Sequence, residues 1–155
     1  GLTMRTLASR LEVTPMSLYR HVGGRDELVQ ALSEMVYADV LEGTEAGDDA
    51  EAKVRGILIR YHQTICRHPQ LTLAIFSTPD ALAGVTRHIT DRLTLLLTGL
   101  AVEPTLWRNL LIDHAHGSGL ACAFAAEGPM RVLTMAQYRN ALDRLIEKLS
   151  ACNGA

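Results

Sequence analysis

Residues 14–22, Thr-Pro-Met-Ser-Leu-Tyr-Arg-His-Val, decide the fold, because they follow a short amphipathic segment and precede a Gly-Gly break. The amphipathic segment spans residues 3–11, where Thr3 is available as a helix N-cap. Pro15 suits the first position of a second helix, because its missing N–H would have no partner there. Leu18 of that second helix would point back at the first, and the pattern predicts a helix-turn-helix. The apolar face of the first helix consists of Leu7, Ala8 and Leu11.

The second helix has an outer surface suited to DNA. Its outward residues mix small, hydroxyl, aromatic and cationic groups, as a helix laid in the major groove requires. Arg20 is the first candidate for a base contact, because a guanidinium group can bind guanine through two N–H groups. Pro15 and Met16 can meet thymine methyl groups, and nearby hydroxyls can reach phosphates. The candidate DNA-binding residues are Thr3, Arg5, Thr14, Pro15, Met16, Ser17, Tyr19, Arg20, His21 and Arg25.

Four short segments of the N-terminal region resemble the signature of the TetR family of transcriptional repressors. They are Leu2-Thr3-Met4-Arg5-Thr6-Leu7-Ala8, Leu11-Glu12-Val13, Leu18-Tyr19-Arg20-His21-Val22 and Arg25-Asp26-Glu27-Leu28, within residues 2–41. The resemblance implies that Tyr19 and His21 touch the DNA backbone and that a further helix precedes Leu2. Glu12 stands where the family usually has Gly. If the backbone there needs a positive φ, Glu12 carries a strain of about 1 kcal/mol.

Composition favours a helical protein and a local basic surface. Apolar residues make up 48% of the 155 residues and aromatics only 5%. The formal net charge is −2, but residues 1–25 contain four arginines against one glutamate, which gives this segment +3 and the remainder −5. Such a basic footprint is what contact with backbone phosphates requires. No apolar stretch approaches the roughly 20 residues needed to span a bilayer, and no signal peptide opens the chain, so we expect a cytoplasmic protein without a membrane partner.

Helical periodicity continues along the chain and predicts an all-α protein in two parts. Residues 1–42 form the DNA-binding head with a linker helix over 25–41, and residues 43–155 form a larger helical-bundle body. A capping box of Thr134 and Gln137 is expected to start the final helix. The predicted helices of the body span residues 49–67, 80–100, 104–127 and 134–151, with a short helix or irregular segment around 71–76.

The last two long helices suggest self-association. Residues 116–126 are almost all small or apolar around the whole helix, so they can hardly face water. The resemblance implies a homodimer held by a four-helix bundle, which would let two heads reach half-sites of a palindromic operator about 34 to 36 Å apart. An ordinary buried helix within one chain is the alternative. The candidate interface residues are Gly117, Leu120, Ala121, Phe124, Leu142, Leu145 and Leu149.

The resemblance also implies that the body binds a small-molecule effector that releases DNA. In the tetracycline-binding member of the family, the magnesium-binding histidine and a nearby arginine align with Ala74 and Thr78 here, which argues against tetracycline–magnesium as the effector. Polar groups set among apolar helix faces are the candidates for lining the pocket. They are His62, Cys66, Thr72, Phe76, Thr78, His88, Trp107, Asn109 and His114.

No metal, cofactor or catalytic motif is evident. Cys66, Cys122 and Cys152 are widely spaced and odd in number, so they are expected to be reduced packing residues, with a redox sensor as the alternative. His114 and His116 point about 200° apart on a helix and cannot easily share a metal. We therefore expect a dimeric, ligand-responsive repressor and no enzyme. The alternatives are a helical interaction module without operator control and, more remotely, an enzyme using His114, His116 and Ser118.

Overall fold

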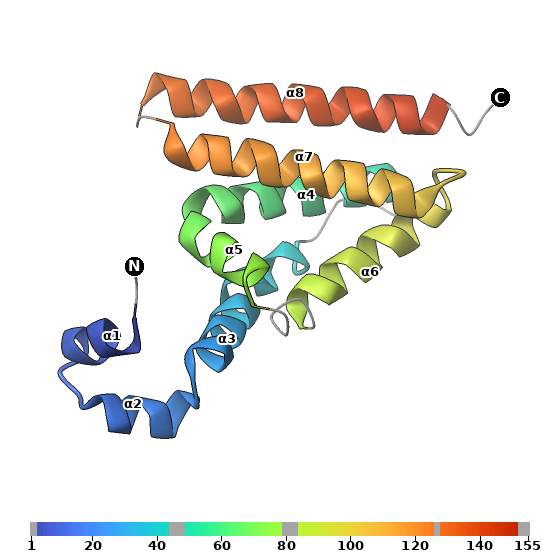
Figure 1. Ribbon diagram of the computed structural model, residues 1–155. Helices are drawn as coiled ribbons and strands as arrows, with labels where there is room; N and C mark the ends of the chain where they lie inside the picture. The colour runs from blue at the N-terminus through green and yellow to red at the C-terminus, as the bar shows by residue number, and fades with distance from the viewer. Residues whose placement is uncertain (1–2, 44–48, 79–83, 126–127, 152–155) are drawn as a thin grey trace.

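The computed structural model describes residues 3–43, 49–78, 84–125 and 128–151, which form eight α-helices, one 3-10 turn and no strand (Figure 1). A small head of two helices projects below one end of a larger body, and α3 runs from one to the other. The all-α fold was predicted from the sequence. The elements are α1 (Met4–Arg10), α2 (Pro15–Val22), α3 (Arg25–Tyr37), η1 (Ala38–Val40), α4 (Ala50–Arg67), α5 (Pro69–Phe76), α6 (Val85–Thr98), α7 (Pro104–Phe124) and α8 (Pro129–Ala151).

Both helices of the head begin at the capping residues that the sequence indicates. The Thr3 hydroxyl accepts a hydrogen bond from the N–H of Thr6 at 3.1 Å, and the Thr14 hydroxyl accepts one from the N–H of Ser17 at 3.1 Å. Each bond satisfies one of the N–H groups that a helix start leaves unpaired. Pro15 occupies the first turn of α2, where no N–H is needed. The start of α2 is therefore determined by local chemistry.

Glu12 turns the chain between α1 and α2 with a positive φ of 55°. Its N–H donates to the carbonyl of Ser9, and the N–H of Val13 donates to the carbonyl of Ala8. This is the hydrogen-bond pattern of a Schellman motif, in which the residue just past the helix end adopts the left-handed conformation. A residue with a Cβ is strained there, so the expected cost at Glu12 applies.

The head has its own small hydrophobic core. Met4, Ala8 and Leu18 are buried in it, and Leu7, Val22 and Leu28 pack partly against them. The prediction that Leu11 belongs to this core was wrong, because Leu11 is 55% exposed. Since α1 ends at Arg10, Leu11 lies in the turn. Met4, seven residues or about two helical turns earlier, is buried in the core instead.

Helix α3 ties the head to two helices of the body. Near its C-terminal end, the Tyr37 hydroxyl lies 2.8 Å from the Thr72 hydroxyl on α5. One turn earlier, the Glu34 carboxylate accepts a hydrogen bond from the N–H of Val85, the first residue of α6, at 2.8 Å. A Cβ at Gly84 would collide with that carboxylate. A shift of α5 or α6 would therefore strain these contacts with α3 or move α3 along with it.

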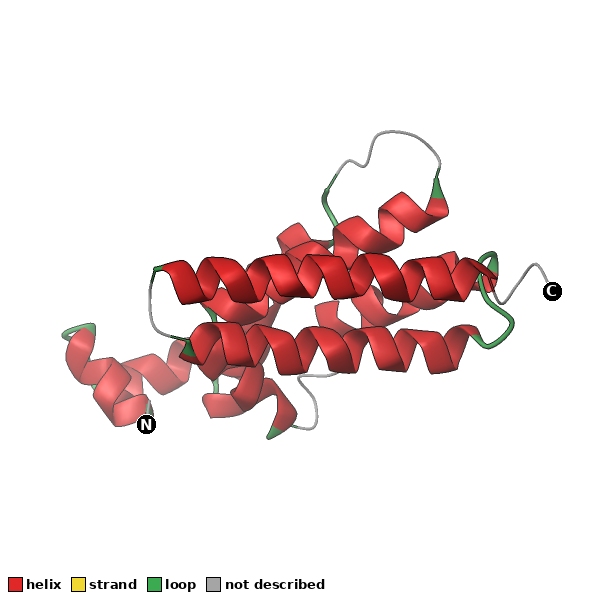
Figure 2. Ribbon diagram, turned by 90° about the horizontal axis from the view of Figure 1, so that it is seen from above, coloured by secondary structure: helices red, strands yellow, loops and turns green. Residues whose placement is uncertain are grey.

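The body packs around α4, with α7 and α8 lying antiparallel as its outer layer (Figures 1 and 2). Helices α4 and α7 approach closely at Gly119, where a Cβ would come within 2.7 Å of the Ile65 side chain. Helix α8 is fastened to α4 by the Tyr138 hydroxyl, which donates to the carbonyl of Leu58 at 3.1 Å. The absence of a side chain at Gly119 therefore allows α4 and α7 to pack closely.

Helix α8 begins five residues earlier than expected. Pro129 starts it, and the Thr134 hydroxyl donates to the carbonyl of Met130 within the helix. The predicted capping box of Thr134 and Gln137 was therefore wrong, because the proline already provides a favourable first turn. The predicted short segment around residues 71–76 is the regular helix α5, and residues 79–83 at the predicted start of α6 lie outside the described residues.

Cys66 and Cys122 form a disulfide bond that joins the C-terminal parts of α4 and α7. The prediction that these cysteines are reduced was wrong, because helix packing brings together two residues 56 positions apart. A guanidinium N–H of Arg131 on α8 donates to both the carbonyl and the sulfur of Cys66, each at 3.4 Å. Cys152 lies outside the described residues.

Candidate DNA-binding surface and ligand cavity

The predicted DNA-binding residues lie at the surface of the head, with Thr3 and Arg25 on the side that faces the body. All ten except the half-buried Ser17 are exposed, and Met16 is 79% exposed on α2. Leu18 faces the opposite way into the core of the head, so it fixes the rotation of α2 and turns Arg20 outward. Arg25 is paired with the exposed Asp26 at 3.5 Å, a weak surface contact that leaves the guanidinium open to solvent.

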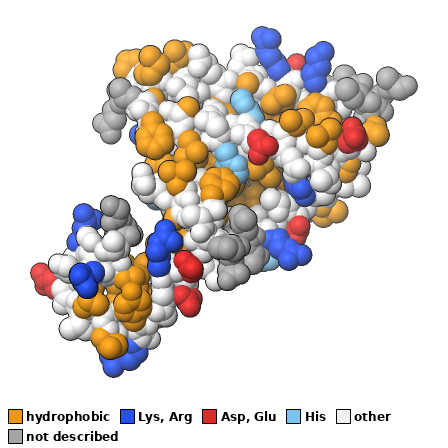
Figure 3. Space-filling view, in the orientation of Figure 1, with side chains coloured by type: hydrophobic (Ala, Val, Ile, Leu, Met, Phe, Trp, Pro, Cys, Tyr) orange, Lys and Arg blue, Asp and Glu red, His pale blue; other side chains and the backbone are white. Residues whose placement is uncertain are grey.

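The surface of the head carries the positive charge that the sequence indicated. Cationic side chains lie at several points around its edge in Figure 3, separated by hydrophobic and uncharged groups. Helix α2 has Arg20 and His21 in its last turn, where cations also stabilise the helix dipole. The arrangement presents a short, protruding helix with cationic and hydroxyl groups on its outside, which is the shape and chemistry that a major groove accepts.

A cavity of about 310 Å³ lies in the body between α5, α6 and α7. One end is aromatic. The rings of Tyr37 and Tyr61 lie 5.6 Å apart, the ring of His116 lies 5.4 Å from Tyr61, and the ring of Phe76 lies 4.9 Å from His116. On the face of the body drawn in Figure 3, hydrophobic and histidine side chains border a hollow. Four rings that meet at tilted or edge-to-face angles form a rigid apolar wall.

The other end of the cavity is polar. Its lining there includes Arg108, Asn109 and Thr90, and Arg87 and Asp113 also border the cavity. The guanidinium of Arg108 donates to the Asn109 side-chain oxygen at 2.8 and 3.1 Å and to the Thr94 hydroxyl at 3.1 Å. An apolar wall with a few convergent polar groups is typical of a small-molecule site.

Burial keeps the aromatic end of the cavity uncharged. It lowers the pKa of His116, against the opposing effect of the Asp113 carboxylate, and it raises the pKa of Tyr61. The Tyr61 hydroxyl and His116 Nε2 lie 2.7 Å apart. At neutral pH the pair is a neutral phenol hydrogen-bonded to a neutral imidazole, so this end favours apolar and aromatic groups.

Three of the nine predicted pocket residues line this cavity, namely Thr72, Phe76 and Asn109. His62 and His114 stack instead on Tyr138 of α8, with ring centroids 3.9 and 5.2 Å away. Cys66 is in the disulfide, and His88 is exposed on α6. The buried Thr78 hydroxyl has no hydrogen-bond partner in the described part of the chain, and Trp107 packs against the main core. These six residues therefore do not line this cavity.

Several lining residues escaped the sequence analysis. Tyr37 lies within the linker helix predicted over residues 25–41, and Tyr61 lies within the helix predicted over residues 49–67. Arg87, Arg108 and Asp113 were given no role in the sequence predictions. His116 was considered only as a possible metal or catalytic residue. The sequence signal that could have indicated the cavity is Arg108, a charged residue that follows Trp107 within an otherwise largely apolar stretch of helix.

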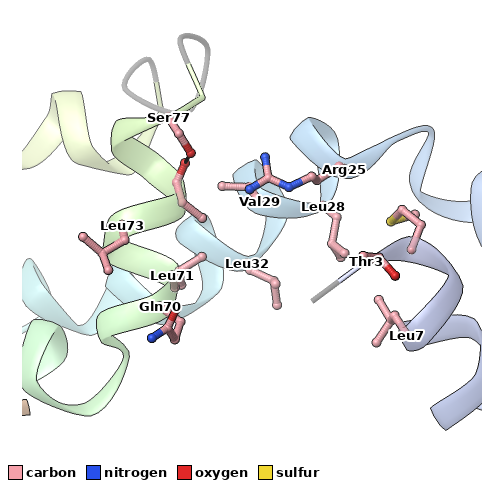
Figure 4. A pocket seen from close by; sticks show the side chains of 12 residues that line it. Thr3, Leu7, Arg25, Leu28, Val29, Leu32, Gln70, Leu71, Leu73 and Ser77 are labelled. Carbon is pink, nitrogen blue, oxygen red and sulfur yellow. Dashed lines mark hydrogen bonds between the residues drawn. The ribbon is translucent and has the colours of Figure 1, made fainter. Parts of the chain in front are cut away.

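A larger cavity of about 710 Å³ lies between the head and the body (Figure 4). Leucines from three helices face it, among them Leu7, Leu28 and Leu71, with Thr3 and Arg25 at its head side. Its lining is mostly apolar, and it offers few groups that could orient a ligand. The smaller cavity is therefore the better candidate for a ligand site. Helix α5 separates the two cavities, because Ala74 lines one and Ile75 the other.

The serine and histidines considered for catalysis do not form the expected set. The partner of Ser118 is His62, with 3.2 Å between the hydroxyl and Nε2, while His116 is bonded to Tyr61. Burial lowers the pKa of His62 to about 4, so its ring is neutral at pH 7. Among the described residues, no three His, Cys, Asp or Glu side chains are grouped to hold a metal ion.

The predicted dimer residues on α7 and α8 differ in how far they are exposed on the single chain. Leu142 and Leu149 are each 1% exposed in the core of the single chain, so they are not available to a second copy and are corrected. Leu120 and Leu145 are half-buried against that core. Gly117, Ala121 and Phe124 are exposed on one face of α7, with Phe124 67% exposed. Leu106 and Leu110 extend the same stripe toward the start of the helix.

Solved structures of transcriptional regulators share this arrangement of helices. The Mycobacterium smegmatis BioQ structure matches with a TM-score of 0.77 and 22% identity, over 97% of this chain and 87% of BioQ. A single-residue variant of TetR from Acinetobacter baumannii AYE, in complex with minocycline, matches with a TM-score of 0.69 and 18% identity, over 97% and 86% of the two chains. The chain therefore has the TetR fold.

One more solved structure and one curated protein sequence are also similar to this chain. A structure described as a putative transcriptional regulator from Streptomyces coelicolor A3(2) matches with a TM-score of 0.72 and 17% identity, over 97% of this chain and 87% of that chain. The HTH-type transcriptional repressor DrrR1 of Streptomyces coeruleorubidus is 28% identical over 159 aligned positions, which cover 97% of this chain. The chain spans 57% of the length of DrrR1. No model of a protein family matches the chain.

None of the described helices combines the length and apolar character that a membrane span needs.

Proposed function

We propose that this chain is a DNA-binding transcriptional regulator, a repressor that binds a palindromic operator as a homodimer and releases it when a small molecule binds. The observation that carries the proposal is the exposed outer surface of α2, with Arg20 turned outward by the burial of Leu18. The basic charge of residues 1–25 supports it. The proposal treats residues 1–42 as the reading head and 43–155 as the body, in a cytoplasmic protein.

The contacts of α3 support a coupling between ligand and head. Its Tyr37 end lines the ligand cavity, and its first turn follows directly on α2. Helix α5 contributes Thr72 to the cavity and is bonded to Tyr37 through that hydroxyl. A ligand that moves α5 or α6 would therefore rotate or shift α3, and with it the head. Such a ligand must bind one position of α3 better than the other to change DNA affinity.

The exposed stripe of α7 supports the homodimer. Leu106, Leu110, Ala121 and Phe124 are apolar or small and open to solvent, with Gly117 between them. A second copy related by a twofold axis would cover the same stripe on both chains and place the two heads for a palindrome. This face replaces the predicted interface at the core residues Leu142 and Leu149.

The proposal is tested by selecting binding sites from random DNA duplexes with the intact protein. We expect an inverted repeat whose half-sites are about one helical turn apart, bound with an affinity that falls steeply as salt increases. A matched protein in which Arg5, Arg20 and Arg25 are replaced by Gln should fail to enrich any site. No enrichment by the unaltered protein, or enrichment that is insensitive to salt, would favour a helical interaction module instead.

A further inference from the structure

We propose that the ligand of the 310 Å³ cavity is an elongated molecule with an anionic group, bound by Arg108, and an aromatic group at the other end, packed against Tyr61, Phe76 and His116. The inference rests on the proposed function only in naming this ligand the effector. It concerns the chemistry of the cavity itself, and so it can be tested without DNA.

The hydrogen bonds of Arg108 leave its charge available. Three of its five N–H donors are used, and both acceptors, the Asn109 amide oxygen and the Thr94 hydroxyl, are neutral. In the described part of the chain, Arg108 has no ion pair with a carboxylate. The two neutral partners hold the half-buried guanidinium in one position, and two N–H groups remain for a carboxylate or a similar anion.

The position of the acidic residue agrees with an anion at this end. Arg87 also lines the cavity, but it is exposed, lies 3.7 Å from Asp91 and is seven residues, or about 10.5 Å, along α6 from Thr94, so the anion is assigned to Arg108 alone. Asp113 is the acidic residue of the described lining, and it lies five residues along α7 from Arg108, about 7.5 Å by the rise of a helix. An anionic group beside Asp113 would be repelled, whereas one at Arg108 is attracted.

The aromatic end fixes the other half of the ligand. The Phe76 and His116 rings meet nearly edge to face, with 74° between their planes, and Tyr61 closes the wall. Because burial keeps His116 neutral, this wall does not attract a second anion. His116 lies eight residues along α7 from Arg108, or about 12 Å, so one ligand must be elongated to use both ends.

Calorimetric titration of the intact protein with 6-phenylhexanoate and its neutral amide, 6-phenylhexanamide, tests the proposal. We expect the carboxylate to bind about tenfold to a hundredfold more tightly than the amide, as a charge-assisted hydrogen bond to Arg108 implies. Benzoate, which is too short to join the two ends, should bind more weakly than 6-phenylhexanoate. In Arg108→Lys, the protein should still bind the carboxylate more tightly than the amide, but by a smaller factor.

Two matched variants identify the group responsible. Arg108→Met should lose the preference for the carboxylate, whereas Arg92→Met, on the exposed surface of α6 and outside the cavity lining, should keep it. Circular dichroism of both variants establishes that they are folded. Equal binding of the carboxylate and the amide, an unchanged preference in Arg108→Met, or no binding of either probe would overturn the proposal. Failure of DNA binding would overturn the proposed function and leave this titration unaffected.

Discussion

The hydroxyl of Tyr37 donates its proton to the hydroxyl of Thr72, 2.8 Å away, inside the body. The direction follows from the second bond of Thr72, whose single proton goes to the carbonyl of His68 at 3.1 Å. Tyr37 is 1% exposed and Thr72 is 2% exposed, so both partners of the bond are buried. This bond joins the helix that follows the reading head to the wall of the ligand cavity.

Removing the two partners of this bond should have unequal effects. Tyr37→Phe leaves Thr72 bonded to His68 and should lower the free energy of unfolding by about 1 kcal/mol. Thr72→Val leaves the Tyr37 hydroxyl buried without an acceptor and should cost about 1 to 3 kcal/mol. Urea unfolding followed by circular dichroism measures both. Equal losses in the two variants would contradict the assigned direction of the bond.

Glu12→Gly should stabilise the head. The residue has φ 55°, where a Cβ costs about 1 to 2 kcal/mol, and the greater freedom of glycine in the unfolded chain returns about half of that. We expect a gain of about 0.5 to 1 kcal/mol in the free energy of unfolding. Glu12→Ala is the control, because it removes the carboxylate but keeps the Cβ. A similar gain in Glu12→Ala would attribute the effect to charge rather than to backbone conformation.

The body should become less stable as the pH falls from about 6.5 to about 4. Burial holds the pKa of His62 at about 4 in the folded chain, whereas the ordinary value is 6.5. Within this window the unfolded state binds a proton that the folded state excludes, so the free energy of unfolding falls, by up to about 3 kcal/mol. His116, whose pKa is also lowered by burial, contributes in the same direction.

Chemical unfolding at a series of pH values measures this loss. His62→Gln should flatten the dependence, because the variant has no proton to bind at this site. His88→Gln, at an exposed position on α6, should retain the slope of the unaltered protein. A slope in His62→Gln as steep as in the unaltered protein would show that His62 is not buried in the neutral form.

Reducing the Cys66–Cys122 disulfide should destabilise the body. The bond closes a loop with a sequence separation of 56, and in the chain-entropy account such a loop stabilises a protein by about 4 kcal/mol, with about 2 to 4 kcal/mol typical. Unfolding with and without a dithiol reductant measures the difference. The double variant Cys66→Ala/Cys122→Ala is the control and should not respond to the reductant. An unaltered protein that is equally indifferent to it would contradict the bond.

The head could be predicted from the sequence because its signals are local. Thr3, Thr14 and Pro15 each act on a helix start within three residues, and Glu12 was recognised as a turn residue with a conformational cost. Leu11 was misplaced because a residue beyond the end of a helix no longer follows its periodicity. Thr134 was misplaced for the opposite reason, since a good cap sequence has no effect inside a helix that Pro129 has already started.

The ligand cavity could not be predicted in the same way. Its aromatic wall comes from Tyr37, Tyr61, Phe76 and His116, which lie on four different helices and are joined only by packing. The Arg108 guanidinium is held by a hydrogen bond to Thr94 on the neighbouring helix, and Cys66 forms a disulfide with a cysteine 56 residues away. Neither contact can be predicted from local sequence. Apolar side chains at helical spacing predict the buried face of a helix. Periodicity does not show which of these side chains fill the core and which line a cavity, because that depends on how the helices pack.

The central claim is that α2 reads DNA through Arg20, and selection of binding sites with Arg20→Ala tests it most directly. We predict a loss of about 1 to 3 kcal/mol in binding and a relaxed preference at one base pair in each half-site, at symmetric positions. Arg10→Ala, at the exposed end of α1, is the control and should leave the preference profile unchanged. A profile for Arg20→Ala identical to that of the unaltered protein would contradict the account.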